Sequence, residues 1–296
     1  MNRPGDVRLN PRTVAWLLRR SVLACFDDGC FSMAKGAAYS ALLSFFPVLT
    51  SAATILVQTR AEFVSNTLEG WLSEIVPPGT EGLVLQQFQA GRRPTALLVV
   101  AGLVSLWAAS GVIKSLIEGF QAAYRVPRNR GILHGNAVAI ALVLLSAVPL
   151  ISASLLLLFG GRAEQRILAW MHGNTAGSEV TWLWSLLSRA MRYAVAFGTT
   201  VMVTALLFYF GPYRRQRWRF VWPGAILATV LWMLATTGFG WYVRNVAHYN
   251  IMYGSVGAGI ALLVWMYLMA AIALIGCEFN AAYERSVPLN PVQSQE

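Results

Sequence analysis

Two charged residues interrupt one of the most apolar stretches of the sequence. Lys114 and Glu118 lie four positions apart within TALLVVAGLVSLWAASGVIKSLIEGFQAA, at residues 95–123. On a helix, residues with this spacing share one face, so the two side chains can form an ion pair. In an apolar environment such a pair can bind a charged ligand or couple to an ion, and it can equally be a structural tie. The sequence leaves both interpretations open.

Four further residues place a polar group or a proline inside an apolar stretch. Glu278 and Asn280 lie in IGCEFNAAYER near the end of the last apolar segment. The Glu278 carboxylate could meet Lys114 or a loop arginine, or simply lie where the helix emerges from the apolar region. Tyr39 lies deep in the first segment, where its hydroxyl needs a hydrogen-bond partner. Pro47 removes a backbone donor, and the apolar run on both sides predicts a kinked helix that passes through it.

The residue patterns that common catalytic sites require are missing. The three histidines, His134, His172 and His248, form no HExxH motif and no cluster with metal-ligand spacing. No serine–histidine–aspartate set, GxSxG elbow or phosphate loop is present. We therefore expect no catalytic residue, no metal and no cofactor. A membrane-embedded enzyme would need a polar cluster near one face, and the sequence alone does not assemble one.

The composition indicates a membrane environment for these residues. The 296 residues are 56% hydrophobic and 12% charged, with a mean hydropathy of +0.54. Soluble domains carry about 25% charged residues. The three cysteines, Cys25, Cys30 and Cys277, are an odd number and do not indicate a disulfide scaffold. The polar, basic N-terminus has no apolar core typical of a cleavable signal, so we expect none.

Six apolar segments are long enough to cross a bilayer, which requires about 20 residues each. They predict an all-α fold, a polytopic membrane bundle of six transmembrane helices with short interfacial helices at 59–94 and a loop at 161–184. Residues 1–33 are predicted as an N-terminal amphipathic segment, and 284–296 as a polar tail. The six segments cover approximately 34–58, 95–123, 132–160, 185–210, 221–243 and 254–282.

Small residues recur at four-residue spacing in three of these segments. The pattern is typical of close helix packing more often than of a ligand site. The sets are Gly36, Ser40 and Ser44; Gly111, Ser115 and Gly119; and Gly254 with Ala258 beside Ser255 with Gly259.

Arginines gather in two connections that the six-helix topology places on the same side. Under the positive-inside rule this side is cytoplasmic, which also places both termini in the cytoplasm. The same arginines could bind the phosphate headgroups of anionic lipids. The net charge of +10 is therefore explained without a nucleic-acid partner, and we expect none. The arginines are Arg125, Arg128 and Arg130 after the second segment, and Arg214, Arg215, Arg217 and Arg219 after the fourth.

Four stretches, AAYSALLSFFPVLT, LWAASGVIKSLIEGFQAAYRVPRNRG, VWPGAILATVLW and YNIMYGSVGAGIALLVWMYLMAAIALIGCEFNAAYER, resemble in this order the YihY/BrkB family. The resemblance covers about residues 30–285 and implies a six-helix bundle in the bacterial inner membrane. Transport is a common proposal for the family. Its older label, ribonuclease BN, is not supported by metal ligands in this sequence. The matching positions are Tyr39, Pro47, Ser110, Gly111, Tyr124, Pro223, Tyr253, Gly254, Gly257, Trp265, Tyr267, Glu278 and Asn280.

Two functions of different classes remain open after the enzyme interpretation is set aside. The first is a transporter or flippase-like protein for a lipid or another envelope amphiphile, with membrane lipids as its partners. It has no ATP-binding motif, so an ion gradient or a partner would drive it. The second is a structural or interaction protein of the cell envelope, which would bind envelope proteins or further copies of itself.

Overall fold

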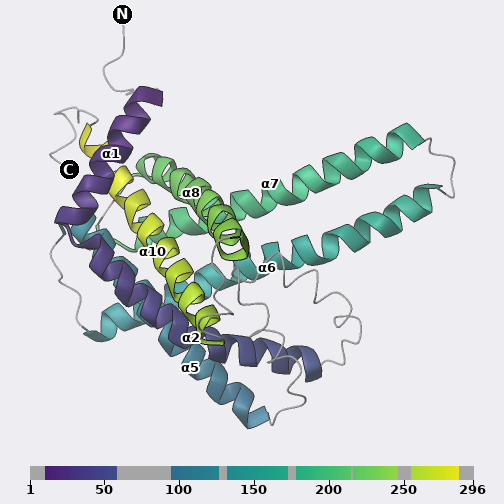
Figure 1. Cartoon of the computed structure of the whole chain (residues 1–296), viewed down its shortest axis with the longest axis horizontal. Helices are drawn as coiled ribbons and strands as arrows, with labels where there is room; N and C mark the ends of the chain where they lie inside the picture. The colour runs from purple at the N-terminus through teal and green to yellow at the C-terminus, as the bar shows by residue number, and fades with distance from the viewer. Residues whose placement is uncertain are drawn as a thin grey trace, which may run out of the picture.

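A computed structural model describes residues 11–58, 95–126, 132–172, 178–214, 216–245 and 255–286. Within these ranges the chain forms seven α-helices and no β-strand (Figure 1). The prediction of an all-α fold is therefore confirmed. In chain order the helices are α1 (Pro11–Asp27), α2 (Cys30–Gln58), α5 (Thr95–Ala123), α6 (Ile132–His172), α7 (Ser178–Phe210), α8 (Trp218–Asn245) and α10 (Ser255–Ser286).

Helix α1 is amphipathic. It buries Leu17, Ser21 and Cys25, which recur every four residues and so share one face. The opposite face exposes Trp16, and the Arg20 guanidinium lies 5.3 Å from the centre of its ring. The buried face packs against α10. The amphipathic character predicted for the N-terminal segment is thus seen in a helix that ends at Asp27.

A two-residue turn joins α1 to α2. Gly29 adopts a φ of 70°, a left-handed conformation that glycine reaches without the steric cost of a side chain. The backbone N–H groups of Ser32 and Met33 donate to the Gly29 carbonyl at 3.0 and 3.3 Å, which starts α2 immediately after the turn. Asp28 is consequently held at the corner between the two helices.

Among the residues that the structure describes, five helices contain stretches long and apolar enough to cross a membrane. Helix α2 has 29 residues, about 44 Å at about 1.5 Å per residue, but is not among the five. Over its whole length α2 is as apolar as α6 and more apolar than α7 and α8, although Lys35 and several serines interrupt its first half. The prediction of six spans is therefore confirmed for five. The five stretches are Val99–Ala123, His134–Ser154, Leu186–Phe210, Trp218–Val243 and Val256–Ser286.

Helix α2 continues through Pro47, as the apolar run around it predicted. Figure 1 shows that α2 changes direction before its C-terminal end. A proline inside a helix removes one backbone hydrogen bond and is a common cause of such a bend. Pro149 in α6 and Pro223 in α8 are likewise enclosed by helix.

The predicted loop at 161–184 is wrong for most of its length, because α6 continues to His172 and α7 begins at Ser178. The extension of α6 contains RAEQRILAW, in which arginine, alanine, glutamate, glutamine and leucine favour helix. Figure 1 shows α6 and α7 running together away from the other helices. The interfacial helices predicted at 59–94 lie outside the described residues.

Helix α10 is the centre of the bundle and packs against α1, α2, α5 and α8. Helices α2 and α5 approach closely through two of the small-residue sets that were predicted to mark close helix packing. A Cβ added to Gly36 would lie 3.3 Å from the Ser115 hydroxyl, and one added to Gly111 would lie 3.0 Å from the Ser40 hydroxyl. These two contacts alternate glycine and serine between the helices, so a Cβ at either glycine would require the facing serine side chain to shift by a few tenths of an ångström.

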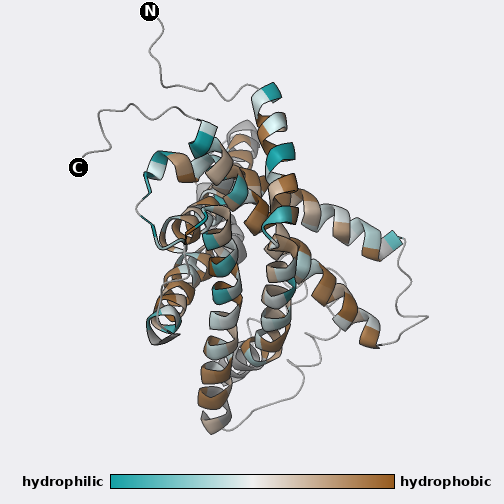
Figure 2. Ribbon diagram, turned by 90° about the vertical axis from the view of Figure 1, so that its left-hand side faces the viewer, coloured by the Kyte–Doolittle hydropathy of each residue, from teal (hydrophilic) through white to brown (hydrophobic). Residues whose placement is uncertain are grey.

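Hydrophilic residues gather toward one end of the bundle (Figure 2). We call this region the basic end. It comprises the α1–α2 turn, residues 124–126 after α5, the described residues 211–214, 216 and 217 between α7 and α8, residues 218 and 219 at the start of α8, and residues 278–286 of α10. Contacts between these segments, described below, bring them together although they are far apart in the sequence.

Candidate functional site

Glu278 is a fully buried carboxylate at the basic end. None of its surface is exposed, and neither carboxylate oxygen receives a hydrogen bond from any described residue. Its cationic neighbour on the same helix is Arg285, whose Nη2 lies 3.6 Å from Oε2. Charge-assisted hydrogen bonds are about 2.7–2.9 Å long, so Arg285 attracts the carboxylate without forming such a bond. A buried charge in this state costs several kcal/mol, which marks Glu278 as an unusual residue.

A second carboxyl group faces Glu278 from the α1–α2 turn. Asp28, which is half-buried, is close enough to Glu278 to act on it through its charge and as a side-chain hydrogen-bond partner. Arg125, directly after α5, also acts electrostatically on Glu278. The sequence suggested Lys114 or a loop arginine as the partner of Glu278. In the structure Arg125, which follows α5, and Arg285 on α10 act on it. Asp28 was not identified from the sequence, because an aspartate beside a glycine is common in turns.

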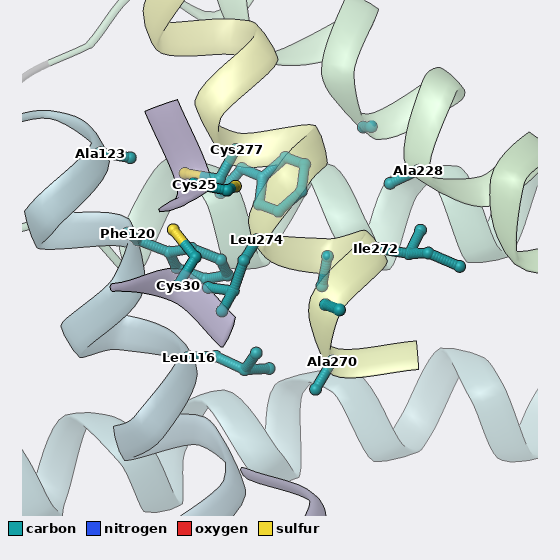
Figure 3. Close-up of a cluster of buried hydrophobic side chains, with 14 of the residues drawn as sticks. Cys25, Cys30, Leu116, Phe120, Ala123, Ala228, Ala270, Ile272, Leu274 and Cys277 are labelled. Atoms are coloured by element: carbon teal, nitrogen blue, oxygen red, sulfur yellow. The ribbon is translucent and has the colours of Figure 1, made fainter. Parts of the chain in front are cut away.

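Three thiols form part of the wall around this carboxyl pair. Cys25, Cys30 and Cys277 come from α1, α2 and α10, and Figure 3 shows them beside Phe120 and Leu274. All three are buried free cysteines. A hydrogen bond with Cys30 and burial together raise the pKa of the Cys25 thiol far above its ordinary value, so this thiol stays protonated. Buried protonated thiols are unreactive, which makes this wall apolar in character.

Asn280 is also fully buried, but it serves a different contact. Its Oδ1 accepts a hydrogen bond from the Gly224 backbone N–H at 2.7 Å, and its Nδ2 donates to the Val221 carbonyl at 2.9 Å. Both partners belong to the first turns of α8. Residues two apart on a helix face different directions, so Glu278 and Asn280 point to separate neighbours. Asn280 therefore acts as a clamp between α8 and α10.

The charged pair on α5 lies away from the Glu278 site. Lys114 is half-buried and Glu118 is exposed, on the helix face opposite that of the buried Phe120. Tyr39 on α2 is 61% exposed, and Pro47 is partly buried. The structure thus places these sequence candidates on or near the outer surface of the described helices, while Glu278 and Asn280 lie inside.

The described arginines of the basic end have side chains at the surface, and two of them contact aromatic rings. Arg214 pairs with Glu284, with Nη2 2.5 Å from Oε1, and its guanidinium lies 5.0 Å from the centre of the Tyr124 ring. Arg219 lies 4.7 Å from the Phe220 ring. Arg125 and Arg217 are also exposed. The other predicted headgroup ligands, Arg128, Arg130 and Arg215, lie outside the described residues.

Two residues of the basic end were not identified as site residues from the sequence. Gln216 donates from Nε2 to the Phe208 carbonyl at 2.7 Å and to the Tyr209 carbonyl at 3.3 Å, which fixes the α7–α8 connection on the end of α7. Tyr124 is buried, and its hydroxyl has no hydrogen-bond partner within the described chain. Burial raises the pKa of the Tyr124 phenol well above its ordinary value, so it stays neutral beside Arg214.

The long apolar helices and the charged residues gathered at one end define a polytopic α-helical membrane protein. The sequence matches the family described as virulence factor BrkB over residues 24–296. The chain belongs to this family, which confirms the resemblance seen in its motifs.

Curated bacterial relatives extend this comparison. YfkH of Bacillus subtilis, named a ribonuclease-like protein, is 28% identical over 248 residues, which cover 82% of this chain and 86% of YfkH. A UPF0761 membrane protein of Alkalilimnicola ehrlichii is 27% identical over 86% of this chain, which spans only 55% of that relative's length. Another, from Alteromonas mediterranea, is 25% identical, with 87% of this chain and 84% of the relative aligned. No solved structure matches the chain.

Proposed function

We propose that this chain is a transporter or flippase-like protein for a lipid or another envelope amphiphile. The observation that carries the proposal is the Glu278 carboxylate, buried without a hydrogen-bond donor beside Asp28 and Arg285. Ionisable groups within membrane helices are costly, and they commonly mark the paths of substrates or ions. A protein that served only as a structural bundle would gain little from this arrangement.

The exposed arginines at the basic end support an amphiphile with an anionic headgroup. The planar guanidinium group binds phosphate oxygens through two parallel hydrogen bonds. Arg125, Arg217 and Arg219 present such groups at the end of the bundle where Glu278 is buried. An amphiphile held there would keep its headgroup against the arginines and its acyl chains along the apolar surfaces of the spans.

We also propose that the protein lies in the bacterial inner membrane, with α2 as its sixth span and the basic end in the cytoplasm. Alkaline phosphatase fused after Gln58 is expected to be active, because this enzyme folds only outside the cytoplasm and α2 would have carried it across. Green fluorescent protein fused after Ser286 is expected to fluoresce. The measurement is reporter activity normalised to fusion-protein abundance in whole cells.

A fusion of the phosphatase between His172 and Ser178 is the matched control, because it is expected to be active with either five or six spans when the basic end is inside. An inactive phosphatase after Gln58 would show that α2 does not cross the membrane. A non-fluorescent protein after Ser286, with abundance intact, would place the basic end outside.

Transport can be measured with the purified chain in liposomes that contain a trace of fluorescent phospholipid. Wild-type protein is expected to expose inner-leaflet label to an external quencher faster than in protein-free liposomes. The variants Arg217→Gln and Arg219→Gln are each expected to slow this exposure about five-fold, which corresponds to about 1 kcal/mol per basic residue near a lipid headgroup. The initial rate of quenching is the readout.

Arg189→Gln is the matched control, because Arg189 is an exposed arginine about 31 Å along α7 from Phe210 and the basic end. It should leave the rate unchanged. An initial quenching rate that is the same in liposomes with wild-type protein as in protein-free liposomes would contradict lipid translocation. The paired substitution Lys114→Met with Glu118→Gln asks in the same assay whether the α5 pair takes part.

The alternative is a structural or interaction protein of the envelope. The Asn280 clamp favours it, because this buried side chain is used entirely in joining two helices. Such a protein would fail the transport assay while its loss still weakened the envelope. The name of YfkH refers to ribonuclease, yet the described residues contain no group of three or more His, Cys, Asp or Glu placed to hold a metal. We propose no enzymatic activity.

A further inference from the structure

The carboxyl groups of Asp28 and Glu278 meet in a way that packing alone does not explain. Asp28 lies at the α1–α2 corner and is half-buried, whereas Glu278 on α10 is fully enclosed. Cys25 and Cys30, which flank this corner, pack in one buried cluster with Cys277, the neighbour of Glu278. The corner therefore brings the Asp28 carboxyl group within interaction range of Glu278. The left-handed Gly29 beside Asp28 maintains the corner that brings the two groups together.

A hydrogen bond between two carboxyl groups requires a proton on one of them. An ionised carboxylate only accepts hydrogen bonds, and a protonated one can donate. With both groups ionised, neither Glu278 oxygen has a donor within the described residues. Two carboxylates in this contact also repel each other, which strongly favours retention of a proton by one of the pair. A single shared proton removes the repulsion and supplies the missing donor.

The surrounding charges do not replace that proton. Arg285 is on the same helix, its side chain is 39% exposed, and it stays 3.6 Å from Glu278, so water screens much of its attraction. Arg125 acts from the end of α5. The other titratable groups that face the site are the thiols of Cys25, Cys30 and Cys277 and the phenol of Tyr124, and none of these carries a positive charge. On the side of α10 that packs against α8, the uncharged Asn280 side chain forms hydrogen bonds with backbone groups of α8.

We propose that Asp28 and Glu278 form a proton-binding site in which the two carboxyl groups share one proton. Asp28 connects the site to the surface of the basic end, and Glu278 extends it into the membrane helices. The site is a property of the folded chain and does not depend on the proposed transport. If the protein does transport an amphiphile, this pair is the group through which a proton could be coupled.

Infrared spectroscopy of the purified full chain tests the proposal, because a protonated carboxylic acid has a C=O stretching band separate from that of a carboxylate. At neutral pH the wild type is expected to show this band, shifted on exchange into D2O. Asp28→Asn and Glu278→Gln are each expected to remove the equivalent of one carboxylic acid from it. Glu284→Gln, a matched substitution six residues along α10 in the Arg214 ion pair, should leave the band unchanged.

Three outcomes would overturn the shared proton. The first is absence of the band in the wild type, which requires no variant to fold. The second is a band that survives in folded Asp28→Asn, since Glu278 would then hold a proton alone. The third is a band that disappears at constant pH when sodium or potassium is added, which would make the pair a metal-cation site.

Discussion

Replacing Gly224 with alanine is expected to lower the free energy of unfolding by about 3 kcal/mol, the upper end of the usual range for overpacking. The added Cβ would collide with the Gly276 backbone carbonyl and lie 2.5 Å from the Asn280 Oδ1. Because one obstacle is backbone on α10, no side-chain rotation relieves the clash, and α8 must move away from α10. Thermal unfolding in detergent, followed by circular dichroism, measures the loss.

Gly238→Ala is the matched control on the same helix. A Cβ at Gly238 meets no heavy atom within 4 Å, so the substitution introduces no clash. Alanine favours helix over glycine by up to about 1 kcal/mol, and this variant should be unchanged or slightly more stable. Equal effects of the two substitutions would show that the α8–α10 approach is not as close as described.

Replacing Asn280 with alanine is expected to destabilise the chain by about 2–4 kcal/mol. The change leaves the buried Gly224 N–H without its acceptor, which costs about 1–3 kcal/mol, and removes the bond to the Val221 carbonyl, worth about 1 kcal/mol. The same unfolding measurement applies, together with the amount of protein that reaches the membrane.

Asn245→Ala provides the comparison, since Asn245 is an exposed asparagine whose Nδ2 donates to the Trp241 carbonyl within its own helix. It should change stability by no more than about 0.5 kcal/mol. If Asn280→Ala unfolds at the wild-type temperature while it abolishes transport, then Asn280 belongs to the transport path and is not a clamp.

Most helices of this protein could be predicted from its sequence, because local patterns of apolar and small residues indicate them. Apolar runs indicated the spans. The four-residue spacing of Gly36 and Ser40, and of Gly111 and Ser115, indicated faces for close helix packing, which the structure shows to meet between α2 and α5. The end of α6 was not readable, because Gly160 and Gly161 and the charges that follow resemble a loop. Glycine costs a helix only about 1 kcal/mol per residue, and the strong helix formers beyond it were sufficient to continue.

The candidate site was only half predictable for a different reason. Glu278 and Asn280 stood out as polar residues in an apolar segment, but their partners are remote in the sequence. Asp28 precedes Glu278 by 250 positions, and Gly224 offers only a backbone N–H. Neither partner has a residue type or spacing that indicates its role. The pairings arise from the packing of α1, α8 and α10, which no local pattern specifies.

The length of α6 restricts how the protein can sit in a bilayer. Its 41 residues measure about 62 Å, against a hydrocarbon thickness of about 30 Å. Even at a tilt of about 40°, the upper end of the usual range, only about 39 Å of helix fits within the hydrocarbon. At this tilt roughly 15 residues of α6 extend beyond the hydrocarbon, and α7 packs beside α6. This excess length would hold the paired ends of α6 and α7 outside the lipid chains.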